Sequence, residues 1–523
     1  MFDPMALDVS EEEPVSAAPV EMVDHAGRAH LPHHAGPVPV KDGEIRSGRL
    51  AGLSMGAAIV TLAWPILCES MLNSTIGLVD TWLAAHISQA ATDAVGAAAY
   101  IQWFVGLITM AIGVGATALV SRSIGAGKMA VAKAALGQAV LLAIIGGVFV
   151  GILMAVLAAP LAELTSLRGE AAHDFRVFLW AYCVGAPFST ILFAGTACAR
   201  GAGDTLRPLW TMVVVNLVNF GTAYLLVRVA GLGVRGIGIG TATAHAVGAG
   251  LILWFHARGA SGVRLTAARM RPHLITIWRL VRLGLPNFFE TLGMWVVNFG
   301  VLLMVGWMGD AAIRAATEGS PVVGDSSGMQ GAHLWAIRVE AFSFLPGFSM
   351  GVAAGALAGQ YLGAGSPNKA RRSVVICAAA AAAIMGTLGL VFIFLGGPIM
   401  HLLSKQPAHR ELTPKLLFIT GLVQVPFALS IVLRSAMHGA GDVRAVMVMT
   451  WISQWCLRLP LAYAISGVDV PVPAWLGGGV IDNPFPFDLG LPGLWIGLTV
   501  EIVIRAIIYG WRFTSGKWLN ARV

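Results

Sequence analysis

Long apolar segments alternate with short polar stretches along most of the chain. Each apolar segment is close to the roughly 20 residues that a helix needs to cross a bilayer. Short connections separate most of the segments, so neighbouring helices should run antiparallel. The pattern predicts an all-α integral membrane protein with twelve transmembrane helices, at about 61–86, 93–120, 132–159, 174–199, 208–230, 234–256, 276–308, 331–360, 370–397, 412–437, 443–465 and 491–513.

The composition supports this prediction and excludes several classes of protein. Of 523 residues, 57% are hydrophobic and only 12% are charged, and the mean hydropathy is +0.76, which no soluble globular domain matches. The net charge of +7 does not indicate nucleic-acid binding, because the Lys and Arg residues are spread over short loops. The five cysteines lie in apolar runs at unrelated spacings, which favours neither a disulfide framework nor a metal site.

The loop charges predict the orientation. Most Lys and Arg residues fall in one set of connections, while the opposite set is richer in acids; the connection with Lys405, Arg410 and Lys415 is the exception. The positive-inside rule then places both termini in the cytoplasm. We expect a multi-pass protein of the bacterial inner (cell) membrane.

The chain divides into four regions. Residues 1–50 lack an apolar run and read as a disordered cytoplasmic tail. Residues 51–256 form a first lobe of six helices and residues 276–523 a second. The linker 257–275 has spaced arginines, which predicts a short amphipathic helix on the inner membrane face. Residues 310–330 and 466–490 are expected to be external loops.

The two lobes repeat each other. Gly125-Ala126-Gly127 recurs as Gly363-Ala364-Gly365, and the Gly-Ala-Gly-Asp sequence at 201–204 recurs at 439–442 with the same sequence offset. Pro65 and Glu69 recur as Pro286 and Glu290 at a slightly shorter offset. Because six helices per copy give both copies the same topology, a pseudo-two-fold axis along the membrane normal should relate them, with a cavity between. This is the architecture of an alternating-access carrier.

The glycine loops do not indicate a nucleotide site. A phosphate-binding loop follows a strand and has a Ser or Thr after its lysine, whereas Lys128 is followed by Met129 and no strand precedes it. Glycines at helix ends instead let the chain turn sharply. We expect no nucleotide partner and no organic cofactor, so an ion gradient, H⁺ or Na⁺, should drive the protein.

Two carboxylates lie in the first apolar segment. Glu69 and Asp80 are eleven residues apart, about three turns, so both should point the same way with Asn73 and Gly77 between them. A carboxylate at the helix centre costs about 2.5–3.5 kcal/mol on insertion scales, so it usually faces a cavity and has a function. The alternative is a carboxylate solvated at the headgroup level.

The second lobe has its own polar positions. Asn287, Glu290 and Asn298 fall near one face of the seventh segment. Glu340 in the eighth segment either forms an ion pair with Arg338 or has a functional role. Arg434 and Arg458 should snorkel or pair with carboxylates. We expect a substrate cavity for small organic cations, given a negative potential by Glu69 and Glu290, and lined by Glu69, Asn73, Asn287, Glu290, Asn298 and Glu340.

Several stretches resemble the multidrug and toxic compound extrusion (MATE) family. They are WPILCESMLNSTIGLVDTWLAAH, AIGVGATALVSRSIGAGKMAVAKAALGQA, LGLPNFFETLG and VEAFSFLPGFSMGVAAGALAGQYLGAG, together with the paired Gly-Ala-Gly-Asp loops. The resemblance covers about 50–520 and implies export of organic cations in exchange for H⁺ or Na⁺. Asp80, Asn219 and Thr241 match the family's ion-coupling site in the first lobe.

The chain also departs from the family pattern. Ala223 stands where a second aspartate follows the asparagine, which removes a hard oxygen ligand and favours protons over sodium. The second lobe has Met294 in place of a glutamate and no acid in 416–437. Our hypothesis is a proton-coupled cation exporter, centred on Asp80, in contact with membrane lipid. The alternatives are a flippase for a lipid-linked precursor, which would need a cation-lined cavity, and a channel or an enzyme; no nucleophile or metal motif supports an enzyme.

Overall fold

The computed structural model describes residue 45 and residues 49–164, 168–316, 328–472 and 478–521. The first lobe contains α1 (Met55–Ala85), α2 (Gln89–Gly125), α3 (Met129–Leu164), α4 (Gly169–Gly201), α5 (Leu206–Tyr224), a π-helical segment (Leu225–Val229) and α6 (Gly233–Ala257). The second contains α7 (Leu274–Ala316), α8 (Met329–Gly363), α9 (Pro367–Leu403), α10 (Pro407–Leu422), α11 (Gln424–Ala440), α12 (Val443–Trp451), a second π-helical segment (Ile452–Arg458), α13 (Leu459–Ser466) and α14 (Gly490–Thr514).

The prediction of twelve membrane spans is confirmed. In the part of the chain that the structure describes, ten helices are long and apolar enough to cross a membrane. α10 and α11 together make another span, bent by 59° at Val423. The remaining predicted span, 443–465, corresponds to a continuous helical run, 443–466, with a π-helical middle. Pro426 lies in the first turn of α11, where its missing N–H leaves no helical hydrogen bond unmade.

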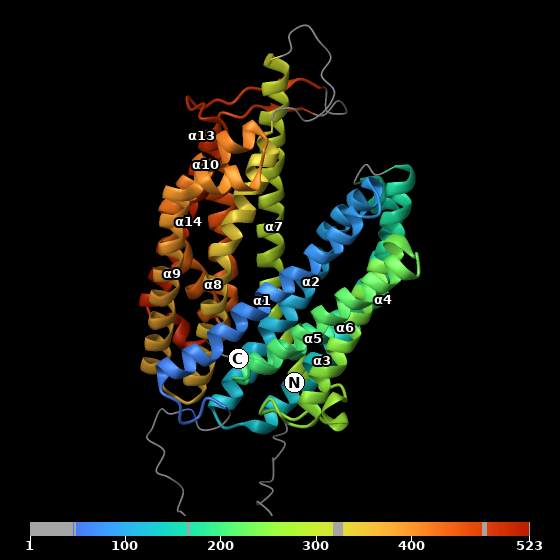
Figure 1. Cartoon of the computed structure of the whole chain (residues 1–523). Coiled ribbons are helices and arrows are strands. Elements are labelled where there is room, and N and C mark those ends of the chain that lie inside the picture. Colours follow the sequence, from blue (N-terminus) through green and yellow to red (C-terminus); the bar gives the residue numbers. More distant parts are fainter. Residues whose placement is uncertain (1–44, 46–48, 165–167, 317–327, 473–477, 522–523) are drawn as a thin grey trace, which may run out of the picture. The chain divides into compact units, whose positions relative to one another are not determined.

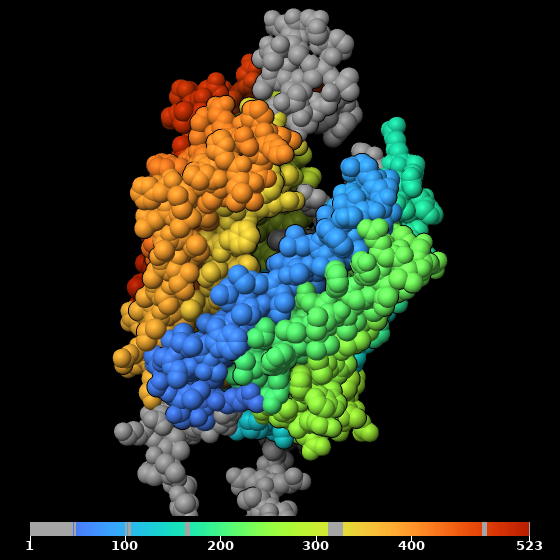
Figure 2. Space-filling view, in the orientation of Figure 1, coloured from blue at the N-terminus to red at the C-terminus, as the bar shows by residue number. Residues whose placement is uncertain are grey.

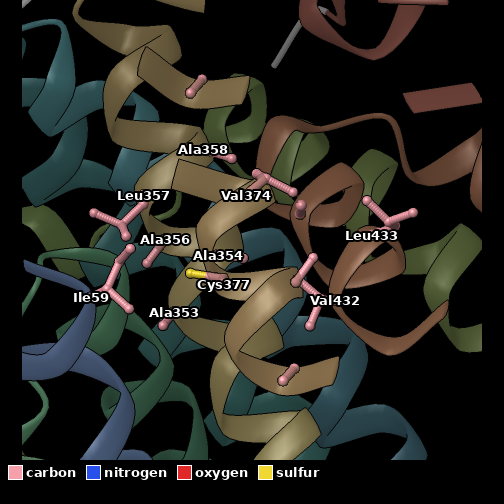
Figure 3. Close-up of a cluster of buried hydrophobic side chains, with 14 of the residues drawn as sticks. Ile59, Ala353, Ala354, Ala356, Leu357, Ala358, Val374, Cys377, Val432 and Leu433 are labelled. Carbon is pink, nitrogen blue, oxygen red and sulfur yellow. The ribbon is translucent and has the colours of Figure 1, made fainter. Parts of the chain in front are cut away.

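Within each lobe the helices pack side by side (Figure 1). α4 contacts α2, α3 and α6 in the first lobe, and α8 contacts α9 and α11 in the second. Small residues permit the close packing in the second lobe: Ala353, Ala354 and Ala356 of α8 share one buried cluster with residues of α9 and α11 (Figure 3). Ile59 of α1 joins the same cluster, so the first half of α1 is part of the second lobe's core.

The repeated glycines lie where the lobes meet at one end, which we call the basic end because it carries the Lys- and Arg-rich loops. A Cβ added at Gly125 of α2 would collide with the Gln360 carbonyl oxygen, and one at Gly363 of α8 would collide with the Arg122 carbonyl oxygen. Only glycine permits such an approach. The repeat therefore serves contact between the lobes.

Two hydrogen bonds across the lobes close the same end. Arg122 of α2 donates to the Ala440 carbonyl oxygen (2.8 Å), and Gln360 of α8 donates to the Gly201 carbonyl oxygen (2.9 Å). The offset that relates the repeated glycines also relates Arg122 to Gln360, so the two donors occupy equivalent positions in the two copies. Each Gly-Ala-Gly-Asp loop thus receives a donor from the opposite lobe.

The linker 257–275 is not the expected amphipathic helix. It consists of turns and one short 3-10 helix, Ala267–Met270. Gly259 and Gly262 adopt positive φ (67° and 81°), a conformation that ends a helix. Gln138 of α3 holds the linker by donating to the carbonyl oxygens of Arg269 and Arg271, both at 2.8 Å.

The other non-helical regions differ in part from expectation. α7 continues through residue 316, into the stretch expected as a loop, and 317–327 lie outside the described residues. In 466–490 two strands of two residues each, β1 (Val470–Pro471) and β2 (Val480–Ile481), pair in antiparallel fashion. A last 3-10 helix spans Lys517–Asn520. Most of the tail 1–50 lies outside the described residues, but Leu50 is buried, so the packed domain begins before residue 51.

Candidate functional site

Asp80 is buried inside the first lobe, where three helices meet. The hydroxyl of Thr241 on α6 lies 3.2 and 3.0 Å from the two carboxylate oxygens. Asn219 of α5 directs its amide nitrogen to Asp80 Oδ1 at 3.5 Å and donates to Thr241 Oγ1 at 3.0 Å. The structure therefore brings together all three residues assigned to ion coupling.

The partners of Asp80 are neutral. Among the described residues, no ion pair involves this carboxylate, although it is only 3% exposed. Asn219 Oδ1 is also buried without a hydrogen-bond partner in the described structure. Burying a charge without a countercharge is costly, so this site is suited to take up a cation or a proton.

Close packing beside the site explains the absence of a second acid. Ala223, one turn after Asn219, is fully buried. A Cβ on Gly240 of α6 would lie 2.7 Å from the Ala223 Cβ, so α5 and α6 are nearly in backbone contact here. The π-helical segment Leu225–Val229 follows directly; such segments often occur next to functional sites.

Glu69 is in a different environment from Asp80. Both carboxylates point into the first lobe, as their spacing predicts, but Glu69 Oε1 accepts from Arg200 of α4 at 2.7 Å. Asn73, one turn later, is exposed. The expectation that Glu69 gives the cavity a negative potential is wrong, because Arg200 neutralises it.

Glu290 is neutralised as well. Its side chain is completely buried and accepts from Arg434 Nε (2.5 Å) and His438 Nε2 (3.0 Å) of α11, and from Thr450 of α12 (2.9 Å). Thr450 also contacts the Tyr509 hydroxyl at 2.6 Å. The pairing expected for Arg434 is confirmed, and the negative potential expected from Glu290 is not present.

A cavity of about 370 Å³ lies between the lobes. Three of the predicted substrate residues, Glu69, Asn73 and Asn287, line it, together with Arg200 and Arg434. Glu290 lies behind Arg434 and is not among the lining residues. Figure 2 shows the surface hollowed where α1 faces α8. We refer to this space as the central cavity.

A second cavity, of about 450 Å³, is lined mainly by the second lobe. Asn298 and Glu340 contribute polar groups, while Trp295, Phe299 and Trp495 supply aromatic walls. We refer to this space as the aromatic pocket. Five of the six predicted substrate residues therefore line two separate spaces rather than one, and Glu290 lines neither.

Glu340 does not pair with Arg338. It accepts a hydrogen bond from Thr420 of α10, and Gln424 bonds to the same threonine hydroxyl at 3.3 Å. The Arg338 guanidinium instead lies 5.9 Å from the centre of the Trp335 ring. Residues two apart on a helix do not face each other, which explains the difference.

Sequence reasoning missed the partners of two buried ion pairs. Arg200 was not singled out, and neither was Glu501 of α14, which accepts from Arg458 at 3.0 Å and lies 3.2 Å from Arg505. A signal for Glu501 exists, because Glu501 and Arg505 are an i,i+4 pair within an apolar segment. Arg200 precedes a glycine loop and has no such local partner.

Comparisons with known proteins agree with this architecture. The MatE family model matches residues 65–225 and 330–464. A probable multidrug resistance protein NorM of Thermotoga maritima is 26% identical over 464 residues, covering 88% of this chain and 92% of that protein. The multidrug resistance protein PmpM of Pseudomonas aeruginosa is 25% identical over 467 residues, covering 86% and 89%.

The fold is also that of solved transporters. An outward-facing multidrug resistance MATE family transporter of the MOP superfamily superposes with a TM-score of 0.77 at 19% identity, covering 89% of this chain and 97% of that one. Another neighbour, a MATE protein in a bent conformation, has a TM-score of 0.76 at 19% identity, covering 88% and 96%. The family model alone matches more than half of the chain. The protein is a member of the MatE family, whose members are membrane transporters and not enzymes.

Proposed function

We propose that the protein is a secondary active antiporter that exports amphipathic organic cations in exchange for protons. The observation that carries this proposal is the environment of Asp80, a buried carboxylate with an amide and a hydroxyl as its only partners in the described structure. Proton binding removes its charge, and proton release restores it. The same residue can therefore exist in two charge states without a permanent countercharge.

Asn219 suits both states of Asp80. Its amide nitrogen now points to the carboxylate, while its Oδ1 has no partner in the described structure. Turning the amide over would offer Oδ1 as the acceptor for a protonated carboxyl. Thr241 can donate to either form. Protonation would thus exchange one hydrogen-bond pattern for another.

Protons suit this site better than sodium. A hard cation wants several oxygen ligands, and the side chains here offer two carboxylate oxygens, one hydroxyl and one amide oxygen on the described residues. Ala223 and its close contact with Gly240 leave no room for another.

The aromatic pocket suits a cationic, apolar substrate. Glu340 supplies a carboxylate that forms no ion pair among the described residues, since Arg458, which lines the same pocket, pairs with Glu501. Trp295, Phe299 and Trp495 supply ring faces that attract cations. The names of the relatives, multidrug resistance proteins, favour the same class of substrate.

The contacts at the basic end support alternating access. Two reciprocal hydrogen bonds and two glycine contacts join the lobes there, and the central cavity lies beyond them. Opening the basic end would require all of these contacts to break. By the loop charges, the present conformation is closed toward the cytoplasm.

Transport in proteoliposomes tests the proposal. We expect an imposed proton gradient, without sodium, to drive uptake of a fluorescent lipophilic cation, and Asp80→Asn to abolish it. Asp93→Asn is the matched control, because Asp93 is exposed and bonds only to Gln89 in the described structure. Full activity of Asp80→Asn, or uptake driven by sodium alone, would contradict proton coupling at this site.

The flippase alternative is less well supported. One observation favours a flippase, because it would need a cation-lined cavity and arginines line the central cavity. The family match nevertheless favours small-molecule export. If wild-type protein transports no cation under either gradient, lipid-linked substrates are the next to test.

A further inference from the structure

Two ion pairs at the central cavity expose the arginine more than its carboxylate partner. The Arg200 side chain is 19% exposed while that of Glu69 is 5% exposed. The Arg434 side chain is 23% exposed while that of Glu290 is fully buried. Each pair is neutral as a whole, but a molecule in the cavity meets the guanidinium groups first.

Both guanidinium groups have donors to spare. Arg200 uses one terminal nitrogen for Glu69, and Arg434 uses its Nε for Glu290. A guanidinium has five N–H donors in a planar fork that matches a carboxylate. The remaining donors of Arg200 and Arg434 have no partner among the described residues that would prevent them from binding a ligand.

Asn287 provides an independent observation. It lines the same cavity, is only 2% exposed, and its amide nitrogen is buried without a hydrogen-bond partner in the described structure. An unpaired buried donor costs free energy. A ligand acceptor at this place would satisfy it.

We propose that the central cavity binds a carboxylate group of the ligand through Arg200, Arg434 and Asn287. A ligand that carries an acidic group should then bind more tightly than the same molecule without it. That such a ligand is also transported rests on the proposed function, whereas its binding does not.

The two arginines belong to different lobes, so a single carboxylate can connect the lobes. Arg200 lies in the last turn of α4 in the first lobe, and Arg434 belongs to α11 in the second. A carboxylate held by both ties the lobes together in this conformation. An acid that reaches only one of them binds without this effect.

The charge of Glu69 determines whether its removal strengthens or weakens binding of an acid. Its Oε2 is buried without a partner in the described structure, and its charge opposes an acidic ligand. Removing this charge frees Arg200 for the ligand, so the Glu69→Gln variant should bind an acid more tightly. Removing both charges, in Glu69→Gln/Arg200→Gln, should bind it more weakly, and leaves no unpaired buried charge to disturb folding.

The test uses two dyes that differ at one group. Rhodamine 123 is a cationic methyl ester, and rhodamine 110 is the same dye with a free carboxylic acid. Equilibrium binding is measured by fluorescence anisotropy on purified full-length protein in nanodiscs without any gradient. Lys415→Gln, an exposed charge removal outside the cavity, is the matched control.

We expect wild type to bind the acid roughly tenfold more tightly than the ester, the effect of one charge-assisted hydrogen bond. Glu69→Gln should increase this ratio, Glu69→Gln/Arg200→Gln and Glu290→Gln/Arg434→Gln should each reduce it, and Lys415→Gln should not change it. Binding of the ester should change less than twofold in all variants.

Equal affinities for the two dyes in wild type, or a preference for the acid that survives both double variants, would overturn the proposal. Its failure is distinct from that of proton coupling. Proton-driven export of the ester without any preference for the acid would support the antiporter and contradict the carboxylate site. A preference for the acid without proton-driven transport would support the carboxylate site and contradict the antiporter.

Discussion

Asp80 of the first lobe differs from Glu290 and Glu501 of the second lobe in what surrounds it. In the first lobe, Asp80 has only an amide and a hydroxyl as partners in the described structure. In the second, Glu290 is bound by Arg434 and His438, and Glu501 by Arg458. A carboxylate with neutral partners can change its charge during a cycle, whereas one fixed by a guanidinium stays ionised and holds helices together.

The repeat shows where the two copies diverged. The offset that relates Glu69 to Glu290 relates Asp80 to Val301, and the offset that relates Gly240 to Gly497 relates Thr241 to Leu498. Val301 and Leu498 are both buried apolar residues. At the basic end the copies remain alike, since equivalent side chains of α2 and α8 make equivalent contacts across the lobes. The duplicated chain kept the contact between lobes and changed the interior chemistry.

The largest effect should come from breaking the ion pair of the second lobe. Arg434→Gln leaves Glu290 buried without its guanidinium, and loss of one partner of such a pair costs about 3–5 kcal/mol of the free energy of unfolding. Asp80→Asn, in contrast, should cost little, because no charge loses its partner. Thermal unfolding in one detergent compares them.

The double variant Glu290→Gln/Arg434→Gln is the control for this loss. It should recover most of the stability, because neither buried charge remains. If Arg434→Gln is as stable as Asp80→Asn, the distinction between structural and functional acids does not hold.

A smaller effect should come from the contact that the lobes share. Gly125→Ala or Gly363→Ala places a methyl group on a backbone carbonyl, an overpacking that costs about 1–3 kcal/mol. Both variants should move the population away from the conformation closed at the basic end. Spin labels at positions 128 and 368 would measure this as a longer distance.

Gly106→Ala serves as the control in the same helix as Gly125, because nothing lies within 4 Å of the added Cβ. It should leave the distance unchanged. Different responses of Gly125→Ala and Gly363→Ala would show that the two copies do not contribute equally to closure.

Glu340→Gln should weaken binding of a cationic dye. Loss of the only carboxylate that lines the aromatic pocket in the described structure should lower the affinity for rhodamine 123 roughly tenfold, about 1.4 kcal/mol. Glu411→Gln, an exposed acid of the same lobe, should have no effect. Unchanged affinity in Glu340→Gln would place the cation elsewhere.

The smallest effect concerns the hydroxyl beside Asp80. Thr241→Val removes the donor to both carboxylate oxygens. Donors favour the ionised form, so the variant should hold its proton more tightly, and the pH of half-maximal transport should rise. A hydrogen bond worth about 1 kcal/mol corresponds to a rise of roughly 0.7 pH unit. A fall in this pH would contradict the assigned role of Thr241.

Much of this protein could be predicted from the sequence. Apolar length determines that a segment spans the membrane, because backbone hydrogen bonds must be satisfied within it. The repeat offsets predict two lobes, and the resemblance brings Asp80, Asn219 and Thr241 together. The linker prediction failed because two glycines with positive φ outweigh a pattern of spaced arginines.

The sequence by itself thus determined the spans, the duplication and the residues beside Asp80, since each follows from local composition, spacing or matching motifs. Only the tertiary structure decided which acids are neutralised. Arg200 lies 131 residues from Glu69, and Arg434 lies 144 residues from Glu290. The charge that a cavity presents depends on which member of each pair is exposed, and that is set by helix packing between distant segments.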